Sequence, residues 1–401
     1  MNTLFNFDPY GSVTTPQGFV AGAAYAGINS HSLFNLDVAM LCSEVPSHGV
    51  GIFTTNQIKA ASVLLCQKIL PSTSVRGIIV NSGCANASTG EAGQADAQSM
   101  GAAAAAKAGV NMADMLVAST GVIGRRLPLE LLNNAIEKII LSPNGGDSFA
   151  QAILTTDTKT KQCAVSCDEF CIGGVAKGAG MIHPNMATML SFLTTDATVE
   201  ISFLQKCLRM AADKSFNMIS VDGDTSPNDS LIMLANGMSE NNQINEGSSQ
   251  AMLFQQALES VCVYLAKELA RDGEGATRLI EMSVFGARNQ EDASKVVHTV
   301  ISSPLVKTAI HGCDPNWGRI VVAAGRSGAS LEESKLDLSI SGIMVMREGM
   351  PLPFDKQQLG HELKQDEVHI NMNLNLGDSS ATGWGCDLSK EYVCINADYT
   401  T

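Results

Sequence analysis

The chain has 401 residues, of which 45% are hydrophobic and 16% are charged. This composition supplies a sizeable apolar core and excludes a disordered chain, and the length allows two or three domains or one large domain. The net charge of −14, from 26 basic and 40 acidic residues, argues against binding to nucleic acid and against docking on an anionic membrane.

Four segments have the composition or the period of a helix: residues 91–107, 128–141, 199–216 and 249–270. Apolar runs predict strands at residues 77–80, 115–119, 189–193, 335–346 and 368–376. Residues 81–90, which are all small or polar, and the polar residues 236–250 are typical of loops. This mixture predicts an α/β protein, built of α+β layers, in which helices pack on mixed sheets.

The sequence shows neither a targeting segment nor a disulfide pattern. The N-terminal residues contain no basic segment followed by an apolar one, so we expect no secretory signal. No run approaches the roughly 18 apolar residues that a membrane span needs. The 11 cysteines are scattered and odd in number, which favours free thiols. We therefore expect a soluble cytoplasmic protein.

Several common sites find no support in the sequence. There is no phosphate-binding loop, no dinucleotide fingerprint, no Gly-x-Ser-x-Gly and no His-Glu-x-x-His. Cys163, Cys167 and Cys171 recur every fourth residue, but without a nearby histidine they favour core cysteines over a metal site. The run that contains Asp222, Asp224 and Asp229 lacks the calcium-loop pattern and is interpreted as a structural segment near the functional site, without a metal. We expect no bound metal.

The segment from Gly173 to Ala197 carries the most chemical information. Glycines lead to Pro184, Asn185 and Ala187, and Thr188 then opens an apolar strand. The Thr188 hydroxyl is placed to attack the carbonyl of Ala187, which would leave Thr188 as a new N-terminus. Its free α-amine, with a reference pKa of about 7.7–8, would then act as the base that activates the hydroxyl. An ordinary threonine at the start of a strand is the alternative that the residues alone leave open.

The stretch Lys177-Gly-Ala-Gly-Met-Ile-His-Pro-Asn-Met-Ala-Thr-Met-Leu190 closely resembles the self-processing signature of the ornithine acetyltransferase family, the glutamate N-acetyltransferases of arginine biosynthesis. Further similar motifs follow along the chain: Gly51–Asn56, Asn81–Asn86, Ser119–Gly124, Thr155–Asp157, Ser220–Thr225, Arg271–Thr277, Asp314–Arg319 and Ile395–Tyr399. Thr400 and Pro227 depart from the usual family pattern, and neither is the nucleophile.

The resemblance implies a precursor that cuts itself between Ala187 and Thr188. Residues 1–187 would form an α chain and residues 188–401 a β chain, with two of each in a heterotetramer. The family fold is related to the self-processing β-aminopeptidases. Thr188 would be the nucleophile, and Thr120 with Gly121 would stabilise the oxyanion. The implied substrate-binding residues are Thr155 or Thr156, Lys177, Thr188, Glu274, Asn396 and Thr401.

The activity implied is transfer of an acetyl group from N²-acetylornithine to glutamate through an acetyl-threonine. It requires no metal and no tightly held cofactor, although some family members also use acetyl-CoA as a donor. One alternative is a self-processing aminopeptidase or amidase, in which water accepts the acyl group. Another is a non-catalytic binding protein, which would remain a single uncut chain.

Overall fold

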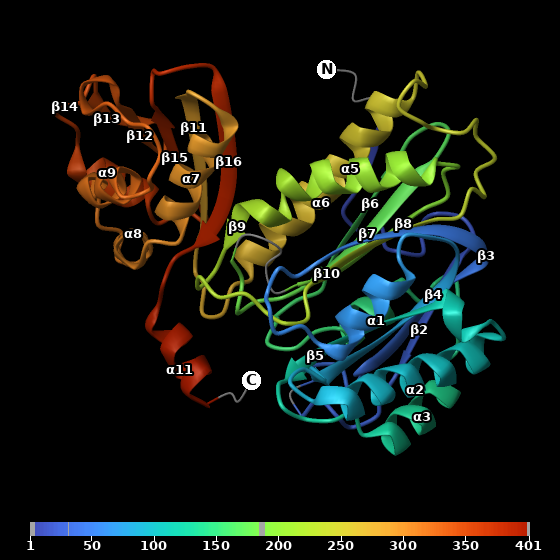
Figure 1. Ribbon diagram of the computed structural model, residues 1–401. Coiled ribbons are helices and arrows are strands. Elements are labelled where there is room, and N and C mark those ends of the chain that lie inside the picture. The colour runs from blue at the N-terminus through green and yellow to red at the C-terminus, as the bar shows by residue number, and fades with distance from the viewer. Residues whose placement is uncertain (1–4, 31, 184–188, 399–401) are drawn as a thin grey trace.

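The structure is a computed structural model that describes residues 5–30, 32–183 and 189–398. Its elements form two lobes, each built on one sheet with helices packed against it (Figure 1). The layered α/β arrangement predicted from the sequence is therefore confirmed. In the part of the chain that the structure describes, the helices are all too short or too polar to cross a membrane.

The larger lobe contains a nine-stranded mixed sheet, in which β8 pairs parallel with β10, and β4 with β5. The strand order is β1 (Asn6–Asp8), β6 (Lys161–Ser166), β7 (Cys171–Lys177), β8 (Leu190–Thr195), β10 (Ser230–Ala235), β3 (Val38–Phe53), β4 (Ser72–Cys84) and β5 (Met115–Val122). Strand β2 (Phe19–Ala24) pairs with β3 off this path. Strands on both sides of residue 187 thus share one sheet.

Both faces of the larger sheet are covered because its central strands are apolar on both faces. In β10, Leu231 and Met233 belong to one core cluster, and Ile232 and Leu234 to the other. Helices α5 (Ile201–Asp213) and α6 (Ala251–Arg271) pack into the first cluster. The second cluster contains residues of α1 (Ala61–Ile69), α2 (Gly90–Ala108), α3 (Leu129–Lys138) and α4 (Gly146–Ala152).

The smaller lobe contains a seven-stranded sheet. The order is β14 (Met350–Pro351), β13 (Ile343–Arg347), β12 (Asp337–Ile340), β15 (Glu367–Asn373), β11 (Leu279–Ala287), β16 (Ser379–Cys386) and β9 (Ile219–Ser220). Its helices are α7 (Gln290–Ile301), α8 (Pro304–His311), α9 (Trp317–Gly325) and α10 (Lys356–Glu362), and α11 (Lys390–Asp398) follows β16. Three short 3₁₀ turns complete the elements: η1 (Met112–Asp114), η2 (Phe216–Met218) and η3 (Glu333–Lys335).

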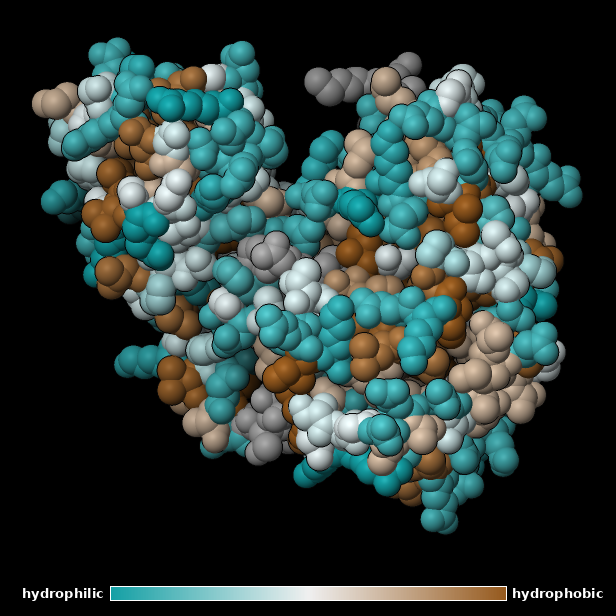
Figure 2. Space-filling model, in the orientation of Figure 1, coloured by the Kyte–Doolittle hydropathy of each residue, from teal (hydrophilic) through white to brown (hydrophobic). Residues whose placement is uncertain are grey.

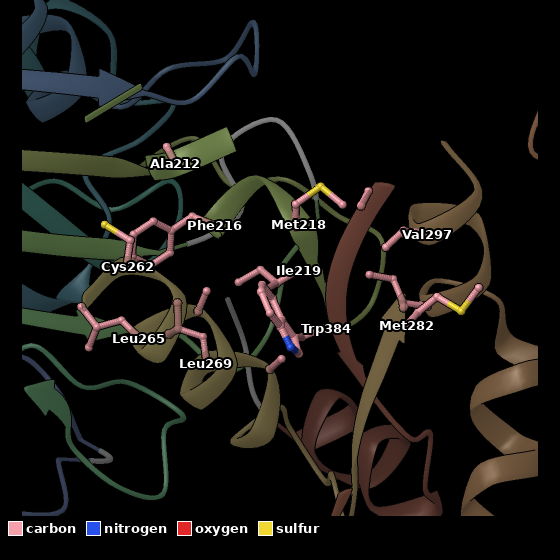
Figure 3. Close-up of a cluster of buried hydrophobic side chains, with 14 of the residues drawn as sticks. Ala212, Phe216, Met218, Ile219, Cys262, Leu265, Leu269, Met282, Val297 and Trp384 are labelled. Atoms are coloured by element: carbon pink, nitrogen blue, oxygen red, sulfur yellow. The ribbon is translucent and has the colours of Figure 1, made fainter. Parts of the chain in front are cut away.

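One apolar core runs from the larger lobe into the smaller one. Figure 3 shows Phe216 and Leu265 on the side of α6, and Met282 and Val297 on the side of the smaller sheet, with Ile219 and Trp384 between them. The surface is hollowed between the two lobes (Figure 2). The continuous core below that hollow fixes the orientation of the lobes, which matters because the candidate site draws residues from both.

The predicted helices are confirmed as α2, α3, α5 and α6, with ends that differ by a few residues. Two strand predictions were wrong in detail. Residues 81–84 were expected in a loop, but they extend β4 because they pair with the end of β5. Residues 335–346 form two strands, since Ser341 and Gly342 turn the chain with φ of 47° and 82°. The other predicted strands differ by a few residues at their ends; β15, for example, ends at Asn373, short of the expected residue 376.

The three regularly spaced cysteines lie in the β6–β7 hairpin. Cys163 and Cys171 are buried on its strands, whereas Cys167 is half-buried in the turn. The described part of the chain holds no group of three His, Cys, Asp or Glu residues arranged to bind a metal.

Candidate active site

A cavity of about 230 Å³ lies where the two lobes meet α11. The ends of β5 and β7, the loop before β10 and the turn after α6 all contribute to its wall. The residues that line it are Thr120, Gly121, Ile123, Thr155, Thr156, Lys177, Gly180, Met181, Asp222, Asp224, Ser226, Asn228, Glu274, Tyr392 and Asn396.

The cavity brings together seven of the residues singled out from the sequence. They are Thr120, Gly121, Thr155, Thr156, Lys177, Glu274 and Asn396. Ala187, Thr188 and Thr401 lie outside the described residues. The roles of all ten stay predictions, but the seven that are described come from widely separated parts of the chain and face one small space.

The wall at the end of β5 depends on a close approach of two glycines. Gly121 has φ of 122°, and a Cβ added to it would lie 2.3 Å from the carbonyl carbon of Gly83. Only glycine fits this position without displacement. Asn228 connects the ends of β4 and β5, because its Nδ2 donates hydrogen bonds to the carbonyl oxygens of Ser119 in β5 (2.6 Å) and of Ala85 just after β4 (2.7 Å). Thr120 and Gly121 are therefore fixed in a rigid frame.

Lys177 is the last residue of β7 and is only 3% exposed. Its Nζ donates a hydrogen bond to Thr155 Oγ1 at 2.9 Å. The sequence left open which of Thr155 and Thr156 has the contact role; both line the cavity, and Thr155 is the one bonded to Lys177. Burial lowers the pKa of Lys177, while the nearby carboxylate of Asp157 opposes this effect.

Glu274 reaches the cavity from a tight turn after α6. Its backbone N–H donates to the carbonyl of Ala179 (2.9 Å), and its Oε2 accepts a hydrogen bond from Asn396 Nδ2 (2.7 Å). Gly180 allows this approach, since a Cβ there would lie 2.5 Å from Glu274 Cδ. A carboxylate and a lysine ammonium thus line the same cavity, which suits a ligand that carries both charges.

Asp222, interpreted from the sequence as structural, holds the chain that leads to residue 183. Its carboxylate accepts hydrogen bonds from the N–H groups of Met181 (2.5 Å) and Ile182 (2.9 Å). Burial raises the pKa of Asp222. Its side chain also lines the cavity, beside Asp224 and Tyr392. The sequence indicated that Asp222 and Asp224 lie near the site, but it gave no signal for Tyr392. The polar, acidic character of this wall is visible only once the fold joins these segments.

The residue that follows Thr188 in the sequence is anchored next to the cavity wall. Met189 is buried, and its N–H donates to Asp229 Oδ1 at 3.1 Å. Asp229 is completely buried and directly follows Asn228, which lines the cavity. Burial raises the pKa of Asp229 well above its ordinary value. The start of β8 is thereby held beside the strand end that carries Thr120 and Gly121.

The sequence reasoning missed a buried ion cluster behind this wall. Lys161 Nζ lies 2.6 Å from Asp157 Oδ1 and 2.5 Å from Asp272 Oδ2. Asp157 and Asp272 each lie in a motif that the resemblance rests on, and Asp157 and Lys161 are four residues apart. The motifs and the four-residue spacing are the features of the sequence that could have indicated the cluster. Nothing in the sequence indicates that Asp272 contacts Lys161.

Comparisons with known proteins match nearly the whole chain to one family. The sequence pattern of the ArgJ family matches residues 20–401. A protein named arginine biosynthesis bifunctional protein ArgJ from Dehalococcoides mccartyi is 54% identical over 405 residues, which cover 100% of each chain. The protein of the same name from Symbiobacterium thermophilum is 47% identical and covers 98% of this chain and 99% of its own.

A crystal structure of arginine biosynthesis bifunctional protein ArgJ from Bacillus halodurans is also similar. It has a TM-score of 0.50 and 42% identity, and the match covers 51% of this chain and 97% of the solved one. The solved chain is therefore about half as long as this one.

Proposed function

Because the chain belongs to the ArgJ family, we propose that it is the acetyltransferase that moves the acetyl group of N²-acetylornithine to glutamate in arginine biosynthesis. The observation that carries this proposal is the convergence of Thr120, Gly121, Lys177 and Glu274 on one cavity. The small volume of that cavity suits an amino-acid derivative, and its paired charges suit the amino and carboxylate groups of such a substrate.

The proposed reaction has two acyl-transfer steps through Thr188. The Thr188 hydroxyl attacks the acetyl carbonyl, its own α-amine takes the proton, and ornithine leaves with that proton as the carbon–nitrogen bond breaks. The amine of glutamate then attacks the acetyl-threonine ester, which releases N-acetylglutamate and restores the hydroxyl. Thr120 and Gly121 supply donors to the oxyanion in both steps.

The binding groups divide by charge. Lys177 is suited to a substrate carboxylate or carbonyl oxygen, and Glu274 to an amino group of ornithine. Asn396 holds the Glu274 carboxylate through its amide and so connects α11 to the site. Acetyl-CoA as a second donor, the last residue Thr401 as a contact, and a cytoplasmic location belong to the same proposal.

Self-cleavage between Ala187 and Thr188 would generate the free amine. The half-length solved chain from Bacillus halodurans supports such a division, because the named full-length relatives match this chain from end to end. The two products, residues 1–187 and 188–401, would stay together since β7 and β8 pair along six residues. Two such pairs would form the heterotetramer.

Intact-mass spectrometry tests the cleavage and the intermediate together. We expect two chains that divide between Ala187 and Thr188, and a single acetyl adduct on the chain that begins with Thr188 after brief exposure to N²-acetylornithine. Thr188→Ser keeps a hydroxyl and should still cut itself, whereas Thr188→Ala should remain one chain without transfer activity. Cleavage of Thr188→Ala at the same bond would reject the assignment of the nucleophile.

Product analysis separates the transferase from a hydrolase. With N²-acetylornithine and glutamate, the transferase forms N-acetylglutamate in step with ornithine. A self-processing amidase would instead release acetate at a rate that glutamate does not change. That result would mean that water, and not glutamate, accepts the acetyl group. The proposed roles of the site residues would not change.

A further inference from the structure

The wall of the cavity is supported from behind by a buried cluster of three charged side chains, Asp157, Lys161 and Asp272. The side chains of Lys161 and Asp157 are 0% exposed, and that of Asp272 is 4% exposed. Burying three charges carries a large desolvation penalty, so such clusters often contribute little to stability. The hydrogen bonds that the two carboxylates make point instead to a role in shaping the site.

Asp157 connects two of the segments that line the cavity. Its Oδ1 accepts a hydrogen bond from the N–H of Gly178 at 2.6 Å, and its Oδ2 accepts one from the N–H of Thr155 at 3.0 Å. Gly178 directly follows Lys177, and Thr155 Oγ1 is the acceptor for Lys177 Nζ. One carboxylate thus sets the backbone on both sides of the Lys177–Thr155 contact.

Asp272 connects a third segment of the cavity wall, the turn that carries Glu274, to the cluster. Its carboxylate accepts hydrogen bonds from the N–H of Thr158 (3.1 Å) and from the Thr158 hydroxyl. Asp272 lies two residues before Glu274, whose N–H is bonded to Ala179. Asp157 and Lys161 precede the expected cleavage site and Asp272 follows it, so the cluster joins the two expected chains at the cavity.

The cluster also supplies charge close to Lys177. Four charged groups from three segments act on Lys177: Asp157 and Lys161 from one segment, Asp229 from the second and Glu274 from the third. The three carboxylates raise the pKa of Lys177, and Lys161 together with burial lowers it. Among the carboxylates, Asp157 has the largest effect.

We propose that Asp157 and Asp272, bridged by Lys161, are positioning residues of the acetyl-transfer site, which hold Lys177, Thr155 and Glu274 in place and keep the Lys177 ammonium matched by a carboxylate. This proposal rests on the proposed function for its kinetic readout. The residues do not touch the substrate cavity themselves; they act through the groups that do.

The pH dependence of kcat/KM for N²-acetylornithine tests this role, because a purely structural role would not move its basic limb. Asp157→Asn removes the carboxylate charge, so the pKa of Lys177 falls further and the basic limb moves to lower pH. We expect the basic limb to shift by about one pH unit. Above the limb, this shift is equivalent to about a tenfold lower kcat/KM for N²-acetylornithine. KM should change more than kcat.

Lys161→Met should move the same limb in the opposite direction, because it removes a cation that lowers the pKa of Lys177. Lys159→Met is the matched control: Lys159 lies two residues away, is exposed, and pairs with Glu268. The basic limb of the pH profile should not move in Lys159→Met. If Lys161→Met does not fold, the comparison of Asp157→Asn with Lys159→Met still decides the question.

A second measurement does not depend on activity. The rate at which acetic anhydride labels Lys177, mapped by peptide mass spectrometry across pH, reports the pKa of that amine directly. The midpoint should move to lower pH in Asp157→Asn and stay unchanged in Lys159→Met. Wild-type protein without transfer activity would reject the proposed function alone, whereas a folded Asp157→Asn variant with an unmoved midpoint would overturn the positioning role.

Discussion

Replacing Gly121 by alanine tests the geometry of the cavity wall at the end of β5, where the proposed oxyanion donors lie, more sharply than removing a side chain would. Gly121 lies at the end of β5, opposite Gly83 of β4. The substitution adds one methyl group and no charge. It therefore perturbs only the backbone position, which is the property that the proposed mechanism requires of this residue.

The magnitude of the effect follows from the structure. The added Cβ would lie 2.3 Å from the carbonyl carbon of Gly83, while ordinary contacts begin at 3.4 Å. The two strand ends must therefore separate by about 1 Å, a displacement that costs about 100-fold in rate when it affects reacting groups. Strain at positive φ adds about 1–2 kcal/mol, and overpacking adds about 1–3 kcal/mol of destabilisation.

Acetyl transfer and thermal unfolding should be measured on Gly121→Ala beside Gly124→Ala. Gly124 also has a positive φ, of 79°, but a Cβ there has no atom within 4 Å. The control should lose about 1–2 kcal/mol of stability and keep its activity within about a factor of two, because Thr120 and Gly121 do not move. If Gly121→Ala transfers acetyl groups as fast as the control, the reasoning about this wall is refuted.

Three further predictions concern other groups. Asn228→Ala leaves two buried carbonyls without their donor, so the free energy of unfolding should fall by about 2–4 kcal/mol and transfer should slow; unchanged unfolding in urea would contradict this. Burial raises the pKa of Cys42 and Cys66 to about 12, whereas Cys394 is exposed, so iodoacetamide at pH 8 should modify Cys394 first, as peptide mapping would show. Burial lowers the pKa of His298 to about 4. Because the unfolded chain, with a pKa of about 6.5, then binds more protons, stability should rise by up to about 3 kcal/mol from pH 4 to 6.5, and His298→Gln should flatten that rise.

The sequence was informative about elements because local patterns specify them. The alanine-rich residues 91–107 and the alternation of Val368, Ile370 and Met372 each bury one face, and both predictions hold in the structure. Residues 81–84 failed because glycine and asparagine favour a loop locally, while pairing with β5 extends the strand. Tertiary pairing of that kind is not encoded in the segment itself.

In the candidate site too, some residues could be predicted from the sequence and others could not. Residues such as Lys177 and Glu274 were found through the resemblance, and the fold then placed them on one cavity. The Asp157–Lys161–Asp272 cluster was missed because Asp272 meets its partners only through the packing of α6 against β6 and β7. Buried charge pairing between distant segments leaves no periodic signature in a sequence.

The expected cut lies in the connection between β7 and β8, and the pairing of these two strands explains how a break in the chain and an intact site are compatible. Lys177 at the end of β7 pairs with Leu190 at the start of β8, and β8 pairs in turn with β10 on its other side. Both ends of the connection are thus fixed by strands that a cut would not disturb. The Met189 N–H is bonded to Asp229, and Asp222 holds Met181 and Ile182. A cut before residue 188 would therefore leave Met189, the next residue along the chain, anchored beside the strand end that carries Thr120 and Gly121. The strand pairing that would hold the two expected chains together acts with the hydrogen bond from Met189 to Asp229, so the proposed cleavage would leave the described walls of the cavity in place.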